Sequence, residues 1–333
     1  MKVFVSGAAG FLGSHLAEAF IHSGHDVVGC DNMIGGDLNN LPEGIRFEEA
    51  DCCDVEAMKR LTVGTDLVYH CAAIATEGLS VFSPALIAKH VYENTAGLLA
   101  GAASNKVKRF VYCSSMARYG VGKPPFREDQ TPHPEDPYGI AKYAGELLVA
   151  NVCDTHGIEH VIAVPHNIIG PKQKYDDAFR NVASIMINRM LQGKQPIIYG
   201  DGEQTRCFSF VQDCVDPLVK MGTLAGLSGQ VINIGPDKET VSINELAKIL
   251  AELLNFDLDS IYVPMRPREV KNATCSADKA RKLLGYESKV GLREGLQSMI
   301  DWIRAHGTKP FSYHLPIEID SPLVPETWKE RLI

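Results

Sequence analysis

The sequence contains no Cys-x-x-Cys pair, and its cysteines and histidines are nowhere grouped at the spacing of a zinc site. The nine cysteines are odd in number and scattered, and several lie within apolar runs. This distribution predicts reduced thiols that pack as small apolar side chains in a cytoplasmic protein, with no metal site. They are Cys30, Cys52, Cys53, Cys71, Cys113, Cys153, Cys207, Cys214 and Cys275.

Long apolar runs and an excess of positive charge are also missing. No stretch is long enough to cross a bilayer, and the N-terminus enters an apolar strand without a signal peptide. With 33 Lys and Arg against 41 Asp and Glu, the net charge of −8 argues against a general nucleic-acid or anionic-membrane surface. We therefore expect a cytoplasmic protein that binds phosphate groups, if at all, through single arginines.

The 333 residues are enough for two lobes. Apolar runs alternate with helical stretches over residues 1–165, which predicts a doubly wound parallel sheet of the Rossmann type. The strand candidates are 2–6, 26–30, 45–47, 66–70, 109–113 and 160–164. The helix candidates are 11–23, 55–61, 84–104 and 138–156.

From residue 166 onward the elements become shorter and Gly, Pro and polar residues more frequent. We predict a smaller α/β substrate lobe over residues 166–306, with amphipathic helices at 181–191, 243–254 and 292–305. The segment 307–333 is rich in Pro and aromatic residues and is predicted to wrap around the surface as a C-terminal extension.

Three glycines with G-x-x-G-x-x-G spacing, Gly7, Gly10 and Gly13, stand between the first strand and the first helix. Without Cβ atoms the backbone can approach a pyrophosphate, and the helix N-terminus offers free N–H groups with a partial positive charge. Phe11 and Leu12 belong to the same turn. In this strand-turn-helix context the spacing predicts a dinucleotide site.

Acidic residues after the next strands indicate which dinucleotide binds. Asp31 closes the second strand, where a carboxylate accepts hydrogen bonds from both ribose hydroxyls and repels a 2′-phosphate. Asn32 follows it instead of an arginine, so NAD is favoured over NADP. Asp51 is placed to meet the adenine edge; the alternative is a helix cap, for which Asp54 is better placed.

Tyr138 and Lys142 stand four residues apart at the start of a predicted helix, and so on one face. A tyrosine can remove a proton at neutral pH only if its pKa, normally about 10, is lowered, and a fixed positive charge nearby has that effect. Together with a nucleotide cofactor, this pair indicates redox chemistry at an alcohol carbon.

These motifs and several others resemble the extended short-chain dehydrogenase/reductase family, and within it the nucleotide-sugar epimerase branch. The resemblance spans about residues 1–305 and runs in the same order through both lobes. The matching segments are 7–13, Asp31, Asp51, 70–73, Asn94-Thr95, 114–120, 138–142, 167–171, 200–206 and 266–269.

The resemblance implies a catalytic group of Ser115, Tyr138 and Lys142. Tyr138 would take a proton from a sugar hydroxyl while a hydride passes from the same carbon to NAD. Lys142 would hold the nicotinamide ribose and lower the pKa of the tyrosine. Ser115 would hydrogen-bond the reacting oxygen, with Ser114 as the alternative. Asn94 would position Lys142 or a water, unless it is a buried structural amide.

The resemblance also implies two sets of ligand contacts. The residues expected around NAD are Gly7, Gly10, Phe11, Leu12, Gly13, Asp31, Asn32, Asp51, Cys52, Cys71, Ala72, Ala73, Asn94, Tyr138, Lys142 and Pro165. Those expected around a nucleotide sugar are Glu77, Ser115, Met116, Asn167, Arg206 and Arg266. The two arginines match residues that clamp a nucleotide diphosphate, which suits a guanidinium fork; surface ion pairs are the alternative.

Met116 and Ala117 stand where the 4,6-dehydratases of the family carry an Asp-Glu pair. Without these carboxylates, the resemblance implies oxidation of the sugar to a 4-ketose, rotation in the pocket and return of the hydride to the other face. This is the reaction of a nucleotide-sugar 4-epimerase, and UDP-hexoses or their N-acetyl forms are the leading substrates. No residue excludes another base or a uronic acid.

Two carboxylates keep alternatives open. Glu77 follows the segment 70–76 in a loop that would border the sugar, and Glu128 is a second candidate. A carboxylate beside the sugar would serve a 5,6-dehydratase, a 5-epimerase or a decarboxylase acting through the same 4-keto intermediate. An NAD-sensing protein without catalysis is a remote alternative, against which the intact Ser115, Tyr138 and Lys142 argue.

The family also implies a homodimer. The counterparts of the helices predicted at 84–104 and 138–156 pair across a two-fold axis in such enzymes. The residues that would serve this interface, or pack on the sheet instead, are Leu98, Leu99, Leu147 and Leu148.

Overall fold

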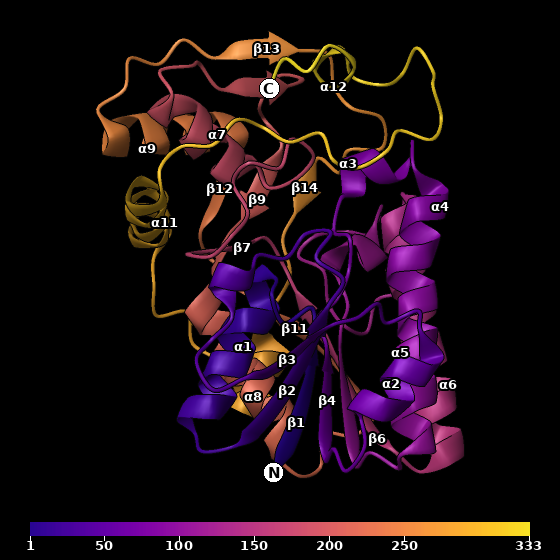
Figure 1. Ribbon diagram of the computed structural model, residues 1–333. Coiled ribbons are helices and arrows are strands. Elements are labelled where there is room, and N and C mark those ends of the chain that lie inside the picture. Colours follow the sequence, from indigo (N-terminus) through magenta and orange to yellow (C-terminus); the bar gives the residue numbers. More distant parts are fainter.

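The computed structural model describes residues 1–333, and its N-terminal lobe is built around a seven-stranded parallel sheet (Figure 1). The strand order is β11-β6-β5-β4-β1-β2-β3, which confirms the predicted doubly wound α/β fold. The strands are β1 (Lys2–Ser6), β2 (Asp26–Asp31), β3 (Arg46–Glu49), β4 (Leu67–His70), β5 (Arg109–Cys113), β6 (Glu159–Pro165) and β11 (Gln230–Ile234).

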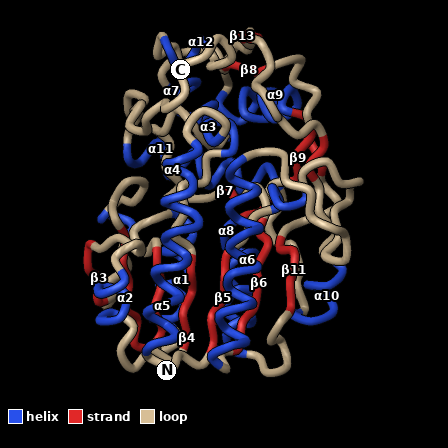
Figure 2. Tube along the Cα trace, turned by 90° about the vertical axis from the view of Figure 1, so that its right-hand side faces the viewer, coloured by secondary structure: helices blue, strands red, loops and turns tan.

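Helices cover both faces of this sheet (Figures 1 and 2). Helices α1 (Phe11–His22) and α8 (Val211–Thr223) lie on one face and share a core with alternate residues of the strands. On the other face are α2 (Val55–Leu61), α5 (Asn94–Ser104) and α6 (Pro137–His156). Because both faces are covered, the central strands are buried throughout, which explains their unbroken apolar runs.

Part of the chain beyond residue 165 returns to the N-terminal lobe. Strand β11 extends the sheet by pairing in parallel with β6, while α8 covers the sheet and α10 (Asp278–Leu284) packs beside β11. The predicted limit at residue 165 is therefore wrong for these elements. The composition changes at residue 166, but local composition does not reveal which later strand pairs with β6.

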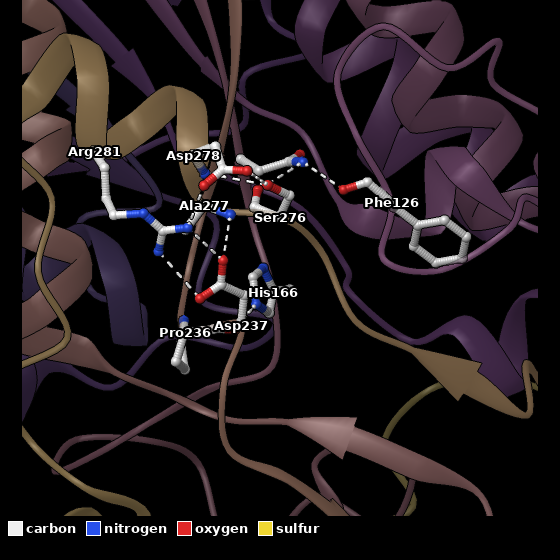
Figure 3. Close-up of polar contacts among 9 residues, drawn as sticks. Phe126, His166, Pro236, Asp237, Ser276, Ala277, Asp278 and Arg281 are labelled. Atoms are coloured by element: carbon white, nitrogen blue, oxygen red, sulfur yellow. Dashed lines mark hydrogen bonds and ion pairs between the residues drawn. The ribbon is translucent and has the colours of Figure 1, made fainter.

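A polar network fastens α10 to the end of β11 (Figure 3). The Asp237 carboxylate accepts hydrogen bonds from the Arg281 guanidinium at 2.7 Å and from the Ala277 backbone N–H at 3.1 Å. The Asn233 side chain, at the same strand, donates to the Phe126 carbonyl at 3.2 Å. These bonds join three segments that are far apart in the sequence.

The second lobe, called the substrate lobe after its predicted role, packs three helices around a core of its own. They are α7 (Val182–Leu191), α9 (Ile243–Leu254) and α11 (Leu292–His306). Its short strands form three small sheets, with the orders β10-β7, β12-β9-β14 and β13-β8. These strands are β7 (Ile168–Ile169), β8 (Ile197–Tyr199), β9 (Thr205–Cys207), β10 (Ser209–Phe210), β12 (Thr240–Ser242), β13 (Ile261–Val263) and β14 (Asn272–Ala273).

The helix predicted at 84–104 is interrupted. It consists of α4 (Pro84–Ile87), the π-helix η2 (Ala88–Glu93) and α5. The remaining elements are short: η1 (Leu38–Asn40), α3 (Glu77–Ser80), η3 (Met116–Tyr119) and α12 (Glu326–Lys329). All nine cysteines are unpaired. None of the helices combines the length and the apolar character that a membrane span requires.

Candidate active site

A cavity of about 450 Å³ lies between the two lobes, beyond the carboxyl ends of the central strands. Its walls contain every residue that the sequence predicted for the two ligands except Met116. Met116 starts the 3₁₀ turn η3 and is 7% exposed, because its apolar side chain turns into the core beside Tyr119 and Phe126. Its sulfur lies 3.7 Å from Nδ2 of Asn167, which lines the cavity.

The glycine turn forms one wall of the cavity. Gly7 adopts a φ of +71°, and a Cβ on Gly13 would overlap the Gly7 carbonyl oxygen. The turn can therefore pack this closely only with glycine at both positions. No side chain caps the N-terminus of α1, so its free N–H groups face the cavity. The residues present fit the pyrophosphate of a dinucleotide.

Two carboxylates follow the turn along the same wall. Asp31 accepts a hydrogen bond from the Met33 N–H at 2.9 Å, and burial raises its pKa. Asp51 accepts from the Cys53 N–H at 2.9 Å and from Nδ2 of Asn32 at 3.2 Å. Burial alone would raise the pKa of Asp51, but these bonds outweigh it and the pKa is lowered. The cap of α2 is supplied by Asp54, as the sequence suggested.

Ser115, Tyr138 and Lys142 meet on the opposite wall. Ser115 follows β5, while Tyr138 and Lys142 lie on the first turns of α6, and all three side chains are buried. The Lys142 ammonium donates to the Cys113 carbonyl at 2.7 Å and lies 5.9 Å from the centre of the Tyr138 ring. Burial lowers the pKa of Lys142 to about 8.

The pKa of Tyr138 differs from the expectation. Burial raises it above the ordinary tyrosine value, and the charge of Glu77 raises it further. A hydrogen bond with Ser115 and the charge of Arg180 act in the opposite direction. The lowering by Lys142 that the sequence predicted is not seen in this structure, where desolvation dominates and the ammonium is bonded to a backbone carbonyl.

Asn94 serves here as a structural amide. It follows the π-helix η2, and its Nδ2 donates to the His90 carbonyl at 2.7 Å and to the Ala72 carbonyl at 3.1 Å. It therefore ties the π-helical turn to the chain that leaves β4, at the edge of the cavity. No hydrogen bond joins it to Lys142.

Glu77 is the first residue of α3, not part of a loop. Its side chain is open to solvent within the cavity but enclosed by protein on its other sides. Burial, followed by the charge of Asp136, raises its pKa to about 7, while Arg206 and Arg266 lower it. Glu128, the other carboxylate considered, does not line the cavity. It accepts a hydrogen bond from the Asn233 N–H at 2.9 Å.

Arg206 and Arg266 converge on one carboxylate at the far side of the cavity. The Glu269 oxygens lie 3.6 Å from Nη2 of Arg206 and 3.0 Å from Nε of Arg266. The Arg266 guanidinium also stacks on the Tyr199 ring, 4.6 Å from its centre. These arginines are therefore not in surface ion pairs. Glu269 and Tyr199 hold them toward the cavity and leave part of each guanidinium for an anion.

One family model matches the part of the chain that contains the nucleotide cradle, the Ser-Tyr-Lys group and Arg206. The model, described as NAD dependent epimerase/dehydratase family, matches residues 3–235. The chain belongs to this family. It is an NAD-dependent enzyme, and its glycine turn and Asp31 are chemically suited to that cofactor.

Known proteins align with this epimerase/dehydratase-family enzyme over almost its whole length. The UDP-glucose 4-epimerase of Thermotoga maritima, solved with UDP-glucose, is 32% identical with a TM-score of 0.87, covering 92% of this chain and 99% of its own. The UDP-glucuronic acid 4-epimerase of Bacillus cereus, solved with UDP-glucuronic acid and NAD, is 31% identical with a TM-score of 0.86, covering 92% and 100%. A UDP-N-acetyl-alpha-D-glucosaminuronate decarboxylase of Bacillus cytotoxicus is 30% identical, covering 91% and 98%.

Several cavity residues of the enzyme were not predicted. Glu269 lies inside the matched segment 266–269, so its motif was visible but its role was not. Arg180 lines the cavity, and its charge acts on the pKa values of Asp31 and Tyr138 against the larger raising effect of burial. No local sequence pattern marked it. The C-terminal extension contributes His314, Leu315, Trp328 and Ile333 to the lining.

The four leucines considered for a dimer interface differ in their exposure to solvent. Leu98 and Leu99 belong to α5 and are fully buried in the core between this helix and the sheet, and Leu148 packs against the same core. Leu147 is 56% exposed. Ile140, seven residues earlier and on the same face of α6, is 54% exposed.

Proposed function

We propose that the enzyme is a UDP-hexose 4-epimerase that acts through a transient 4-keto sugar. The observation that carries the proposal is the joint placement of Ser115, Tyr138 and Lys142 on one wall of the cavity that holds Arg206 and Arg266 on another. The first group suits proton transfer at an alcohol carbon, and the second suits a diphosphate.

The residues that would hold NAD are the glycine turn for the pyrophosphate, Asp31 for the adenosine ribose and Lys142 for the nicotinamide ribose. When bound, NAD would supply reversible hydride transfer at C4 of the sugar. The positive charge of a bound nicotinamide, together with Lys142, would lower the pKa of Tyr138, which burial raises in the protein alone. Tyr138 would then take the proton of the 4-hydroxyl as the carbonyl forms and return it to the same oxygen. Ser115 would hydrogen-bond that oxygen.

Glu77 supports a neutral hexose as the substrate. Its pKa responds to both arginines, and its charge raises the pKa of Tyr138, which is consistent with a position between the diphosphate and the reacting carbon. An ionised carboxylate there repels a uronate, because like charges in a partly desolvated cavity disfavour each other. UDP-glucose, UDP-galactose and their N-acetyl forms are therefore favoured over UDP-glucuronate.

A second candidate rests on the same residue. A carboxyl group with a pKa of about 7 is suited to take or give a proton at C5 of a 4-keto sugar. That step belongs to a 5-epimerase or a 5,6-dehydratase. A decarboxylase would need a uronate, against which the charge of Glu77 argues.

We also propose a homodimer formed through α6. Its support is the pair of exposed apolar side chains, Ile140 and Leu147, on one face of this long helix. Helices α5 and α6 run side by side along the same face of the molecule (Figure 2), as a helical interface between two copies requires.

The test is an NMR assay of the purified enzyme with UDP-glucose, UDP-galactose, their N-acetyl forms and UDP-glucuronate, without added reductant. We expect the C4 epimer of a neutral hexose with no net NADH, and Tyr138→Phe should abolish it. A vinylic or deoxy-keto product would instead establish the dehydratase. No conversion of any of these sugars would overturn the proposed substrate.

A further inference from the structure

The C-terminal segment 307–333 runs from the substrate lobe to the N-terminal lobe (yellow in Figure 1) and contributes four residues to the cavity lining. At its start, Tyr175 of the substrate lobe donates a hydrogen bond to the Gly307 carbonyl at 2.7 Å. Further on, the Glu318 carboxylate accepts hydrogen bonds from two backbone N–H groups at the start of α4, at 2.9 and 2.8 Å. The segment is thus tied to both lobes.

Apolar side chains of this segment are buried between the lobes. The Trp328 ring is 3% exposed and meets Phe82 of the N-terminal lobe and Phe179 of the substrate lobe edge-on, with ring centres 6.2 and 5.4 Å apart. The same cluster contains Leu79 of α3, the helix that carries Glu77 into the cavity. The segment is therefore a packed part of the cavity wall.

One hydrogen bond connects the segment to the arginine pair. Thr327 is 3% exposed, and its hydroxyl shares a hydrogen bond of 2.6 Å with the Tyr199 hydroxyl. The Arg266 guanidinium in turn stacks on the Tyr199 ring, 4.6 Å from its centre. A single aromatic ring thus stands between Thr327 and a cation suited to a diphosphate.

The relatives reported above leave part of this chain unmatched. The Thermotoga maritima structure covers 92% of this chain and 99% of its own, which leaves about 27 residues of this chain unmatched. The family model begins at residue 3, so we assign the surplus to the C-terminal end, where 307–333 has this length.

We propose that segment 307–333 is part of the nucleotide-sugar site, with Thr327 as a positioning residue for the nucleoside diphosphate half of the substrate. Thr327 holds the Tyr199 ring, and the ring orients Arg266 toward the diphosphate. The inference rests on the proposed function for the identity of the ligand. It adds that affinity for the nucleotide depends on a segment outside the matched fold.

The test compares Thr327→Val, which keeps the shape but removes the hydroxyl, with Thr327→Ser, which keeps the hydroxyl. Titration calorimetry on the NAD-loaded enzyme measures binding of UDP, dTDP, GDP and CDP alone. We expect Thr327→Val to weaken binding of the preferred nucleotide by about fivefold, the typical contribution of one hydrogen bond, and Thr327→Ser to restore it. In turnover, the effect of Thr327→Val should fall on KM and not on kcat.

Two further variants sharpen the experiment. Tyr199→Phe removes the same bond from the other side, so it should show a similar loss, and combining it with Thr327→Val should add little. Thr155→Val is the matched control, because its hydroxyl bonds the Asn151 carbonyl at the exposed end of α6.

Each outcome decides the proposal. Wild-type affinity in Thr327→Val would overturn the positioning role while the proposed function stands, and so would equal losses in Thr327→Val and Thr327→Ser. If the wild-type enzyme binds none of the four nucleoside diphosphates, both the inference and the proposed function are wrong.

Discussion

Replacing Glu77 by Gln tests how the cavity selects its sugar. The substitution keeps the size of the side chain and removes its charge. In the wild-type enzyme the pKa of Glu77 is raised to about 7, so the carboxyl group titrates within the working range of the assay. For a pKa of about 7, protonated Glu77 outnumbers the ionised form about tenfold at pH 6, and the ratio is reversed at pH 8.

The expected result follows from the charge. Only the protonated form of Glu77 tolerates a uronate, so kcat/KM for UDP-glucuronate should fall about tenfold per pH unit above pH 7, relative to UDP-glucose. In Glu77→Gln this ratio should be independent of pH and higher than in the wild type at pH 8. Because the charge of Glu77 also raises the pKa of Tyr138, the variant should reach its full rate at a lower pH.

The measurement is kcat/KM for both sugars between pH 6 and 9, taken as a ratio so that titration of shared groups cancels. Glu49→Gln is the matched control, because Glu49 is exposed at the end of β3 and is not part of the cavity wall. If Glu77→Gln keeps the pH dependence of the ratio, another group is responsible and the assignment of Glu77 to the sugar is wrong.

Three further predictions concern the cofactor, the core and the assembly. Gly13→Ala should abolish NAD retention, because the added Cβ would overlap the Gly7 carbonyl oxygen. Gly291→Ala is the control and should retain NAD, because there is open space around Gly291. HPLC of the nucleotide released from each variant measures retention. Glu146→Gln should lower the free energy of unfolding in urea by about 3–5 kcal/mol. Arg118 is 5% exposed and lies 2.9 Å from Glu146, so the substitution leaves it as an unpaired buried charge. Combining Glu146→Gln with Arg118→Met should recover part of this loss. Leu147→Glu should convert the proposed dimer to a monomer in analytical ultracentrifugation, and a monomeric wild type would contradict the α6 interface.

Much of the fold and of the cofactor site could be predicted from local sequence. The turn of Gly7, Gly10 and Gly13 joins a strand to the helix that follows it, so the spacing itself specifies the close packing that glycine permits. Tyr138 and Lys142 share a face because four residues make about one helical turn. Alternating apolar runs and helices are sufficient to indicate a parallel sheet.

Three features were decided by the tertiary structure alone. They are the pairing of β11 with the sheet, the ion pairs of Glu269 with Arg206 and Arg266, and the course of residues 307–333 along the cavity wall. So were the direction of Met116 and the raised pKa values of Tyr138 and Glu77. Each of these depends on contacts between distant segments, or on how much water those contacts remove from a charged group. Local periodicity encodes neither, so the sequence determined the chemistry available to this enzyme, and packing decided which groups meet and how each is charged.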